Sequence, residues 1–236
     1  MLCKIAELLT EVPAAGGMAS RCRDYLTVEQ AAPELVICET RYQAQAKSWP
    51  QLREEYLAYM ASGDQFYWGL LRFGGLMLHA SAVALEGRAY LFSGPCGRGK
   101  STHTWLWQSV FGERAQVFND DKPALRRLDG RWYAYGTPWC GKDGINLNQK
   151  WPLGGICFLE KAEENRIRRL SAAEALPLML AQTTYRLQPQ SMDLLLASLD
   201  KLLREVPVFL LENRPEEAAA RLSYETMRRA AEEEGL

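Results

Sequence analysis

The stretch that decides the fold of this 236-residue chain is Gly94-Pro95-Cys96-Gly97-Arg98-Gly99-Lys100-Ser101. It fits the phosphate-binding loop pattern, Gly-x4-Gly-Lys-Ser, without a mismatch. Glycines let backbone N–H groups turn inward around phosphate oxygens, and a helix that begins at the lysine adds its positive end. Lys100 would reach the β- and γ-phosphates, and the Ser101 hydroxyl would ligate magnesium. The stretch therefore predicts a site for a nucleoside triphosphate with Mg²⁺.

The segments on either side of this loop strengthen the prediction. Residues 88–93 have the composition of a short buried strand, and residues 101–111 have the pattern of a helix that Gly112 ends. A chance glycine-rich turn seldom has both neighbours. Arg98 either touches a phosphate or faces water, and the sequence leaves both alternatives open. The residues expected to bind the nucleotide are Gly94, Pro95, Cys96, Gly97, Arg98, Gly99, Lys100, Ser101 and Thr102.

An acidic pair, Asp120-Asp121, follows a strand expected at residues 115–119. A phosphate loop normally works with a carboxylate at the end of a neighbouring strand that holds magnesium. Two adjacent carboxylates can serve one site, with one as proton acceptor and the other for the metal. The alternative is a solvated turn, because Asn-Asp-Asp is common turn chemistry. Beside the phosphate loop, the functional interpretation is favoured.

Two further features give weaker signals. His79 begins a strand that is expected to pair, through a hairpin, with the strand that carries the phosphate loop. It can therefore point toward the γ-phosphate or toward Asp120. The alternative is a structural role, because a histidine beside an apolar run is more often a core or edge residue. The glycine-rich loop at residues 136–144 either closes over the phosphates, with Lys142 as a cation for phosphate or acceptor, or is a connecting turn. His103, inside the expected helix, is interpreted as structural.

Composition limits the classes of partner and location. The 28 basic and 29 acidic residues give a net charge of -1, which favours neither a nucleic acid nor a membrane partner. The six cysteines form no C-x-x-C pair, which argues against zinc and favours reduced thiols. The N-terminus lacks the pattern of a signal peptide, and no apolar run approaches the length of a membrane span. These features predict a cytoplasmic protein.

The order of expected elements predicts an α/β fold with a mixed β-sheet core and a helical C-terminal part. We expect two domains, a small N-terminal α+β segment at residues 1–75 and a domain with the phosphate loop at residues 76–236. In the first segment the expected strands lie at 4–9, 22–28 and 35–40, with a helix after Pro50 that stops near Ser62-Gly63. Beyond the acidic pair we expect strands at 124–128, 131–135, 153–160 and 206–211 and helices at 172–181, 192–205 and 216–234. A strand is also expected over residues 76–84.

With these motifs in place, the chain resembles the bacterial HPr kinase/phosphorylase superfamily, whose fold is shared with phosphoenolpyruvate carboxykinase. It looks most similar to the shorter HPr-kinase-related proteins of bacterial peptide-modification clusters. The resemblance covers about residue 76 to the C-terminus, and the first 75 residues match only loosely. The matching runs are His79-Ala80-Ser81-Ala82-Val83, the phosphate loop, Asn119-Asp120-Asp121 and residues 136–144.

The resemblance implies a reaction and roles for the residues. It implies magnesium-dependent transfer of a phosphoryl group from ATP to a hydroxyl, typically of serine. By this analogy Asp120 is the general base, Asp121 helps to hold magnesium beside Ser101, and His79 orients or polarises the acidic pair. Because members of the family are hexamers, the resemblance also suggests a homo-oligomer.

One departure from the family pattern limits the analogy. HPr kinases carry a Glu-hydrophobic-Arg-Gly signature where this chain has Thr137-Pro138-Trp139-Cys140-Gly141-Lys142. In the family, that signature is tied to the phosphorylase reaction and to HPr docking, so its absence argues against both. The acceptor therefore stays open between a peptide, a protein and a small molecule.

Two other functions compete with a kinase of this kind. One is a nucleotide-binding regulatory or assembly module with little or no phosphoryl transfer. The other is a nucleoside or nucleotide kinase, for which the arginines at 126–127 and 166–169 are candidate lid residues, although solvated strand edges explain them as readily. The hairpin before the phosphate loop and the strands after the acidic pair fit that second function poorly.

Overall fold

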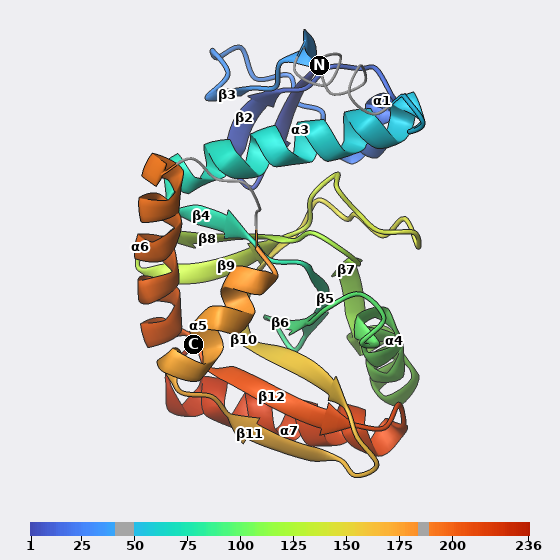
Figure 1. The fold of residues 1–236 in the computed structure, drawn as a ribbon, viewed down its shortest axis with the longest axis vertical. Coiled ribbons are helices and arrows are strands. Elements are labelled where there is room, and N and C mark those ends of the chain that lie inside the picture. The colour runs from blue at the N-terminus through green and yellow to red at the C-terminus, as the bar shows by residue number, and fades with distance from the viewer. Residues whose placement is uncertain (41–49, 184–188) are drawn as a thin grey trace.

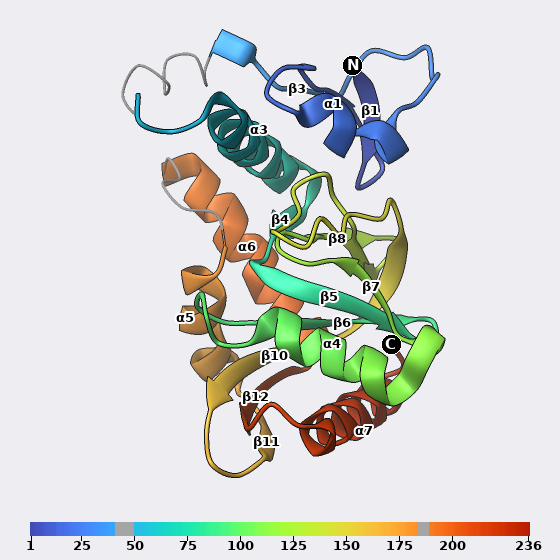
Figure 2. The same ribbon diagram turned by 90° about the vertical axis from the view of Figure 1, so that its right-hand side faces the viewer.

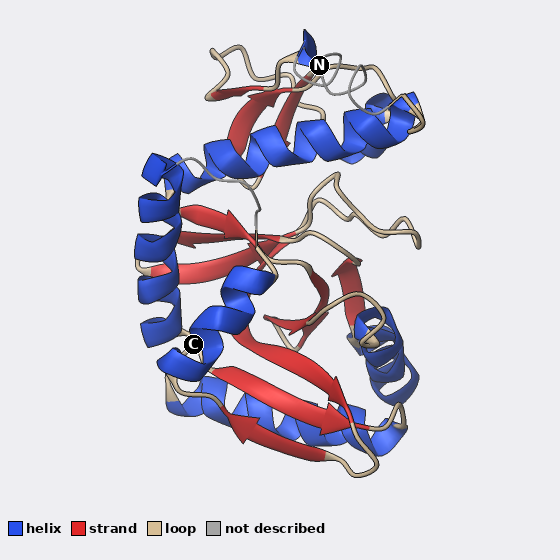
Figure 3. Cartoon of the chain, viewed as in Figure 1, coloured by secondary structure: helices blue, strands red, loops and turns tan. Residues whose placement is uncertain are grey.

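Two sheets organise the chain in the computed structural model, which describes residues 1–40, 50–183 and 189–236 (Figure 1). The smaller sheet has three strands in the order β1-β2-β3, and the larger one is a curled mixed sheet. Helices flank the larger sheet, so the fold is mixed α/β, as the sequence predicts (Figure 3). The division into two domains at residue 75 stays a prediction.

The smaller sheet begins with a hairpin in place of the single strand expected at residues 4–9. Ala6 and Glu7, with φ of 49° and 63°, form the tight turn between its strands. The strand expected at residues 22–28 is wrong, because Arg23–Tyr25 forms a single 3₁₀ turn that buries the Tyr25 ring. The elements of this region are β1 (Leu2–Ile5), β2 (Leu8–Glu11), α1 (Met18–Arg21), η1 (Arg23–Tyr25) and β3 (Leu35–Val36).

The long helix α3 (Glu54–Leu70) does not stop at Ser62-Gly63, as the sequence suggested. A Cβ on Gly63 would lie 3.0 Å from Cδ1 of Trp139, and the Trp139 indole N–H donates to the Ser62 hydroxyl at 3.0 Å. The two small residues therefore make room for a tryptophan from the second glycine-rich loop. In Figures 1 and 2 this helix lies between the smaller sheet and the strands that follow η2 (Leu71–Phe73).

The larger sheet has nine strands among the residues that the structure describes, with a main path β4-β8-β9-β10-β6-β5-β7. Its longest strand, β10, pairs antiparallel with β9 through residues 150–152 and parallel with β6 through residues 153–158. The strands are β4 (Gly75–Met77), β5 (Ala80–Leu85), β6 (Arg88–Ser93), β7 (Gln116–Asn119), β8 (Ala124–Leu128), β9 (Arg131–Tyr135), β10 (Lys150–Lys161), β11 (Arg166–Arg169) and β12 (Val208–Asn213).

Strand directions bring the important loops to one edge of this sheet. β5 runs antiparallel to both β6 and β7, so β6 and β7 point the same way. β10 is parallel to β6, and β12 is parallel to β10. The carboxyl ends of these four strands therefore lie at the same edge, where open α/β sheets bind their ligands.

Helices cover both faces of this part of the sheet (Figure 2). Alternate side chains of β6 follow the two-residue period of a strand: Tyr90 and Phe92 pack in the cluster with Trp107, whereas Ala89 and Leu91 pack in the cluster with Met179. The flanking helices are α4 (Lys100–Phe111) with η3 (Gly112–Arg114), α5 (Ala172–Ala181), α6 (Pro189–Glu205) and α7 (Glu217–Glu233). None of the described helices has the length and apolar character that a bilayer span requires.

Several expected elements are confirmed, one more expected strand is interrupted, and one strand was not expected. β6, β8, β9 and α5 have the expected bounds. The strand expected over residues 76–84 is interrupted, because Leu78 N–H bonds to Pro123 and His79 N–H to Gln182, between β4 and β5. The strand β11 was not expected, because its sequence, Arg-Ile-Arg-Arg, is mostly exposed and lacks an apolar run.

Candidate active site

The phosphate loop connects β6 to α4, between a buried strand and the first turn of a helix. Three glycines of the loop have positive φ, namely 143° at Gly94, 79° at Gly97 and 95° at Gly99, which side chains disfavour. Gly99 is the N-cap residue of α4, so the free N–H groups of that helix point into the loop. This is the backbone arrangement that anions bind at helix N-termini.

Lys100 is the first residue of α4 and is half-buried. Its ammonium donates to the carbonyl oxygen of Gly94 at 2.9 Å and lies 3.5 Å from that of Pro95, so the side chain folds back over the loop. Burial lowers the pKa of Lys100, and the negative charge of Asp121 opposes that shift. A partly desolvated ammonium over a backbone nest is a suitable partner for phosphate oxygens.

The other predicted nucleotide contacts surround this lysine. Pro95, Cys96, Gly97, Arg98 and Thr102 are exposed, whereas Gly94 is buried and Ser101 is half-buried on the first turn of α4. A hydroxyl pair, Ser81 and Thr104 at 2.8 Å, ties β5 to α4 behind the loop. The loop is thus supported from within and open toward solvent.

Asp121 lies at the centre of a polar network. Its Oδ1 is 3.2 Å from His79 Nε2, and its Oδ2 accepts from Lys122 Nζ at 2.6 Å and from the Tyr59 hydroxyl at 3.0 Å. Burial by itself raises the pKa of Asp121, but the hydrogen bonds and charges of His79 and Lys122 outweigh it and hold the pKa well below its ordinary range. Asp121 is therefore ionised, as a metal ligand must be.

His79 is fixed on two sides. Its Nδ1 lies 3.0 Å from Oε1 of Gln182, its backbone N–H donates to the Gln182 carbonyl, and its own carbonyl accepts from Ser93. The pairing of Ala80 with Ser93 in the β5–β6 hairpin places His79 beside the start of the phosphate loop. Of the acidic pair, the hydrogen-bonded partner of His79 is Asp121.

Asp120 occupies a separate, more enclosed position, with 6% of its surface exposed. Its Oδ1 accepts from the Gly141 amide at 2.7 Å, and its Oδ2 from the Asp143 amide at 3.1 Å. Burial raises the pKa of Asp120, although these two hydrogen bonds oppose the shift. Neighbouring carboxylates with pKa values displaced in opposite directions are typical of acid–base sites.

The second glycine-rich loop closes around Asp120. Glycine at 141 lets the loop approach closely, because a Cβ there would lie 3.0 Å from Asp120 Oδ2. Trp139 anchors the same loop in the core of the N-terminal region, where it stacks on Phe66 at 4.8 Å. Lys142 is exposed at the tip of the loop. The loop therefore positions a carboxylate and presents a lysine to solvent.

Three residues that shape the site were not expected from the sequence, namely Tyr59, Lys122 and Gln182. Asn119 accepts from the Asp121 and Lys122 amides at 3.1 and 2.8 Å and so holds the acidic turn; this is the turn chemistry that Asn-Asp-Asp suggested. Gln182 and Tyr59 come from distant helical segments, and no local pattern pointed to them. Lys122 directly follows the acidic pair, but its role as the Asp121 partner depends on the fold.

The N-terminal region reaches the site through two tyrosines of α3: the Tyr59 hydroxyl donates to Asp121, and the Tyr67 hydroxyl donates to the Lys122 carbonyl at 2.5 Å. Arg21 and Lys122 lie 4.8 and 4.5 Å from the centroid of the Tyr59 ring, and Arg21 also contacts Cys140 Sγ at 2.9 Å. Cation–π contacts of this kind hold the ring and both cations in place. Tyr59 thereby connects α3 to Asp121.

Replacing Tyr59 by phenylalanine should lower the free energy of unfolding by about 1 kcal/mol, because the half-buried Asp121 carboxylate loses a hydrogen bond. The matched control is Tyr56→Phe, since Tyr56 lies on the same helix and is exposed. Urea denaturation of both variants measures the difference. Equal stability of the two variants would show that the Tyr59 hydroxyl does not support Asp121.

Acid stability provides a second test, in metal-free buffer. The folded-state pKa of Asp121 is depressed from its ordinary value of 3.8, so its contribution to stability is full above that value and is lost as pH falls through the folded pKa. From about pH 5 to about pH 2, wild type should therefore lose more stability than Asp121→Asn. Asp193→Asn, at an exposed position of α6, is the control and should follow the wild-type slope.

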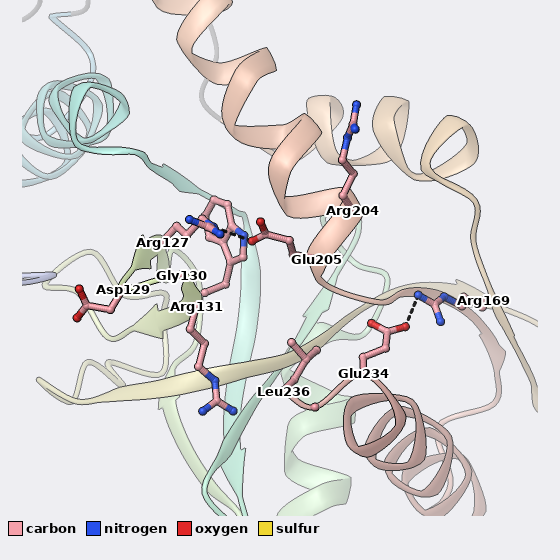
Figure 4. A pocket seen from close by; sticks show the side chains of 11 residues that line it. Arg127, Asp129, Gly130, Arg131, Arg169, Arg204, Glu205, Glu234 and Leu236 are labelled. Carbon is pink, nitrogen blue, oxygen red and sulfur yellow. Dashed lines mark hydrogen bonds and ion pairs between the residues drawn. The ribbon is translucent and has the colours of Figure 1, made fainter.

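Another hollow, drawn in Figure 4, is lined by Arg127, Arg131, Arg169 and Arg204 together with Glu205 and Glu234. Arg127 pairs with Glu205 at 2.7 Å, and Arg169 pairs with Glu234. Arg127, Arg131 and Arg169 lie on strands, and Arg204 lies near the end of α6. Acidic side chains pair with three of them, because Arg204 also bonds to Asp200 at 2.9 Å. The phosphate loop does not line this hollow, so we assign no function to it.

The residues at the phosphate loop fit a magnesium–nucleotide complex. Within residues 1–40, 50–183 and 189–236, no group of three acidic, histidine or cysteine side chains forms a cage for a metal ion. Magnesium in nucleotide sites is normally held by one or two protein oxygens, with phosphates and waters completing its shell. Ser101 and Asp121 would supply such oxygens next to the backbone N–H groups of the loop.

No protein-family model matches this chain, and no curated protein sequence matches it either. Among solved structures, the Hpr(Ser) kinase/phosphatase from Coxiella burnetii aligns with 64% of this chain and 97% of its own, at 14% sequence identity and a TM-score of 0.36. Because that score is low, the functional argument depends on the residues of the site.

Proposed function

We propose that this protein is an ATP- and Mg²⁺-dependent phosphotransferase, related to HPr kinases, that transfers the γ-phosphate to a serine-type hydroxyl of a peptide, protein or small molecule. The observation that carries the proposal is the meeting of Lys100 and the acidic pair at one edge of the sheet. Ala80 of β5 pairs on one side with Ser93, which directly precedes the phosphate loop, and on the other side its N–H donates to the Asp121 carbonyl at 3.0 Å, so the two loops leave the sheet side by side.

The phosphate loop supplies binding and charge stabilisation. Backbone N–H groups of residues 96–101, on the loop and the first turn of α4, would surround the β- and γ-phosphates, and Lys100 would leave the Gly94 carbonyl for a phosphate oxygen. Ser101 and Asp121 would hold Mg²⁺, which neutralises charge on the transferred group when bound. These interactions would position the γ-phosphate and stabilise the negative charge that develops in the transition state of the transfer.

Asp120 would accept the proton of the attacking hydroxyl. Its enclosed position raises its pKa, which makes it a better base than an exposed carboxylate. The amides of Gly141 and Asp143 orient its oxygens. Asp121, kept ionised by His79 and Lys122, would serve the metal, so the two carboxylates have different roles.

His79 would act as a positioning residue. It touches Asp121 through Nε2, and Gln182 holds the other side of its ring. Lys142 is the candidate contact for an acceptor or a phosphate, because it is exposed on the loop that carries the Gly141 amide. The preference for ATP over GTP is carried by the resemblance to HPr kinases alone.

The direct test is to follow the γ-phosphate. The full chain is incubated with Mg²⁺ and γ-labelled ATP, together with serine-containing peptides or small hydroxyl compounds, and the label is traced. The proposal predicts phosphate on a hydroxyl acceptor and faster ATP turnover when that acceptor is present. Label that appears only as inorganic phosphate, at a slow rate that no acceptor changes, would instead support a nucleotide-binding regulatory module.

A further inference from the structure

A hollow of about 630 Å³ lies beside the phosphate loop, against the first turns of α4. Gly97, Gly99 and Thr102 form the side shared with the loop, and the far side comes from the segments that follow β10 and β12. The phosphate loop thus borders the hollow on one side and the expected phosphate site on the other. A ligand whose phosphates occupy the nest can extend directly into the hollow.

The strand order explains why a hollow forms at this place. β6, β10 and β12 are adjacent and parallel, so the segments that leave their carboxyl ends border one space. Ala162 directly follows β10, and its N–H donates to the carbonyl of Asn213 at the end of β12 at 3.1 Å. Ligands of open α/β sheets bind in the crevice outside these strand ends.

The lining combines a small apolar surface with charged groups. Leu106, Ala162 and Pro215 provide the apolar part, and Arg98, Glu163 and Arg214 stand among the charged residues. The volume of the hollow lies within the roughly 300–1,000 Å³ of small-molecule sites. A flat base and its sugar need such an apolar slot with a few polar groups at the edge.

One wall of the hollow is ordered by its own hydrogen bonds. Glu216 accepts from Arg214 Nη2 at 2.6 Å and from Asn165 Nδ2 at 2.6 Å, and Asn165 Oδ1 accepts from the Arg214 amide at 3.0 Å. The planar guanidinium of Arg214 is therefore held in place, and such a group stacks well on an aromatic ring. The Glu163 carboxylate is exposed beside it and suits ribose hydroxyls.

We propose that this hollow binds the nucleoside part of the triphosphate, with its base between Leu106 and the Ala162–Pro215 side and its ribose near Glu163. The inference rests on the proposed function, because it assumes that phosphates occupy residues 94–101. It assigns base and sugar recognition to the segments after β10 and β12, neither of which carries a sequence motif for nucleotides.

Binding of Mg²⁺-ATP and Mg²⁺-tripolyphosphate to the same variants tests the inference. Ala162→Phe fills the hollow without changing the phosphate loop, and calorimetry should show ATP affinity lower by about tenfold or more, with tripolyphosphate affinity within about twofold of wild type. Leu106→Ala, which removes apolar contact, should also weaken ATP selectively. Ala173→Phe, an exposed position of α5, is the matched control and should change neither ligand.

The outcomes separate this inference from the proposed function. If wild type binds both ligands and neither Ala162→Phe nor Leu106→Ala weakens ATP, the nucleoside binds elsewhere and the inference is wrong, while the phosphate site stands. If both variants lose tripolyphosphate as much as ATP, the hollow belongs to the phosphate site and the assignment to the nucleoside is wrong. If wild type binds neither ligand, the proposed function fails and the inference fails with it.

Discussion

Replacing Asp120 by asparagine should lower the rate of phosphoryl transfer by about 10²- to 10⁴-fold, the usual contribution of a general base, with nucleotide affinity nearly unchanged. Asparagine has the same shape but cannot accept the hydroxyl proton. Lys100 and Asp121, to which we assign phosphate and metal, remain. The rate is measured by label transfer from γ-labelled ATP, and the affinity by calorimetry.

The same substitution should change the stability of the protein little. The raised pKa of Asp120 means that burial makes its charged form less favourable in the folded state than in the unfolded state, and a neutral asparagine removes that cost. Against this gain, the two Asp120 oxygens accept from the Gly141 and Asp143 amides, and asparagine keeps only one oxygen, so one of these hydrogen bonds is lost. Because the two effects oppose each other, we expect a thermal unfolding midpoint close to that of wild type near neutral pH. Transfer is then compared at a temperature at which both proteins are folded.

Asp143→Asn is the matched control for this prediction. Asp143 lies in the same loop and is exposed, and its backbone amide, which donates to Asp120, is kept in the variant. It should retain wild-type transfer. Transfer that survives in Asp120→Asn would contradict the assignment of the general base and would favour direct attack without a carboxylate.

Replacing Lys100 by alanine should reduce the affinity for Mg²⁺-ATP by about 100-fold, and transfer should fall at least as much. The Lys100 ammonium lies over the loop and is half-buried. Its attraction to phosphate is therefore screened less by water than that of a lysine at the surface. Removing it also frees the Gly94 carbonyl, to which it donates. Equilibrium dialysis with labelled ATP measures the change.

Lys201→Ala is the control for Lys100. Lys201 is exposed on α6, and its replacement removes the same charge from the whole chain. If Lys100→Ala and Lys201→Ala bind ATP with the same affinity, any change from wild type is an effect of overall charge. The role assigned to Lys100 in the loop is then wrong. A selective loss in Lys100→Ala is the expected result.

The region around the phosphate loop could be predicted because its signals are local. Turn residues fix the hairpins, as Asp129 and Gly130 show with φ of 48° and 82°, and the loop itself needs its glycines. The N-terminal region was predicted less well. Its elements are short, and the length of α3 depends on Trp139, which lies 76 residues beyond Gly63 in the sequence. Contacts of this kind leave no local pattern.

The candidate site also has a part that the sequence predicted and a part that it did not. The pattern of residue types indicated Lys100, Ser101 and the acidic pair, and the fold places them at one sheet edge. The surroundings that displace the two carboxylate pKa values in opposite directions, burial for Asp120 and cationic partners for Asp121, could not be foreseen. Tyr59 and Gln182 reach Asp121 and His79 from distant parts of the chain, and backbone amides of the second glycine-rich loop bind Asp120.

The most direct measurement of the central claim is a calorimetric titration of ATP into the wild-type chain, with Mg²⁺ and with a chelator in its place. Binding at the phosphate loop with Ser101 and Asp121 as metal ligands predicts saturable heat with Mg²⁺ and clearly weaker affinity in the chelator. Absence of binding under both conditions would contradict the claim, because a loop of this geometry would then not be a nucleotide site.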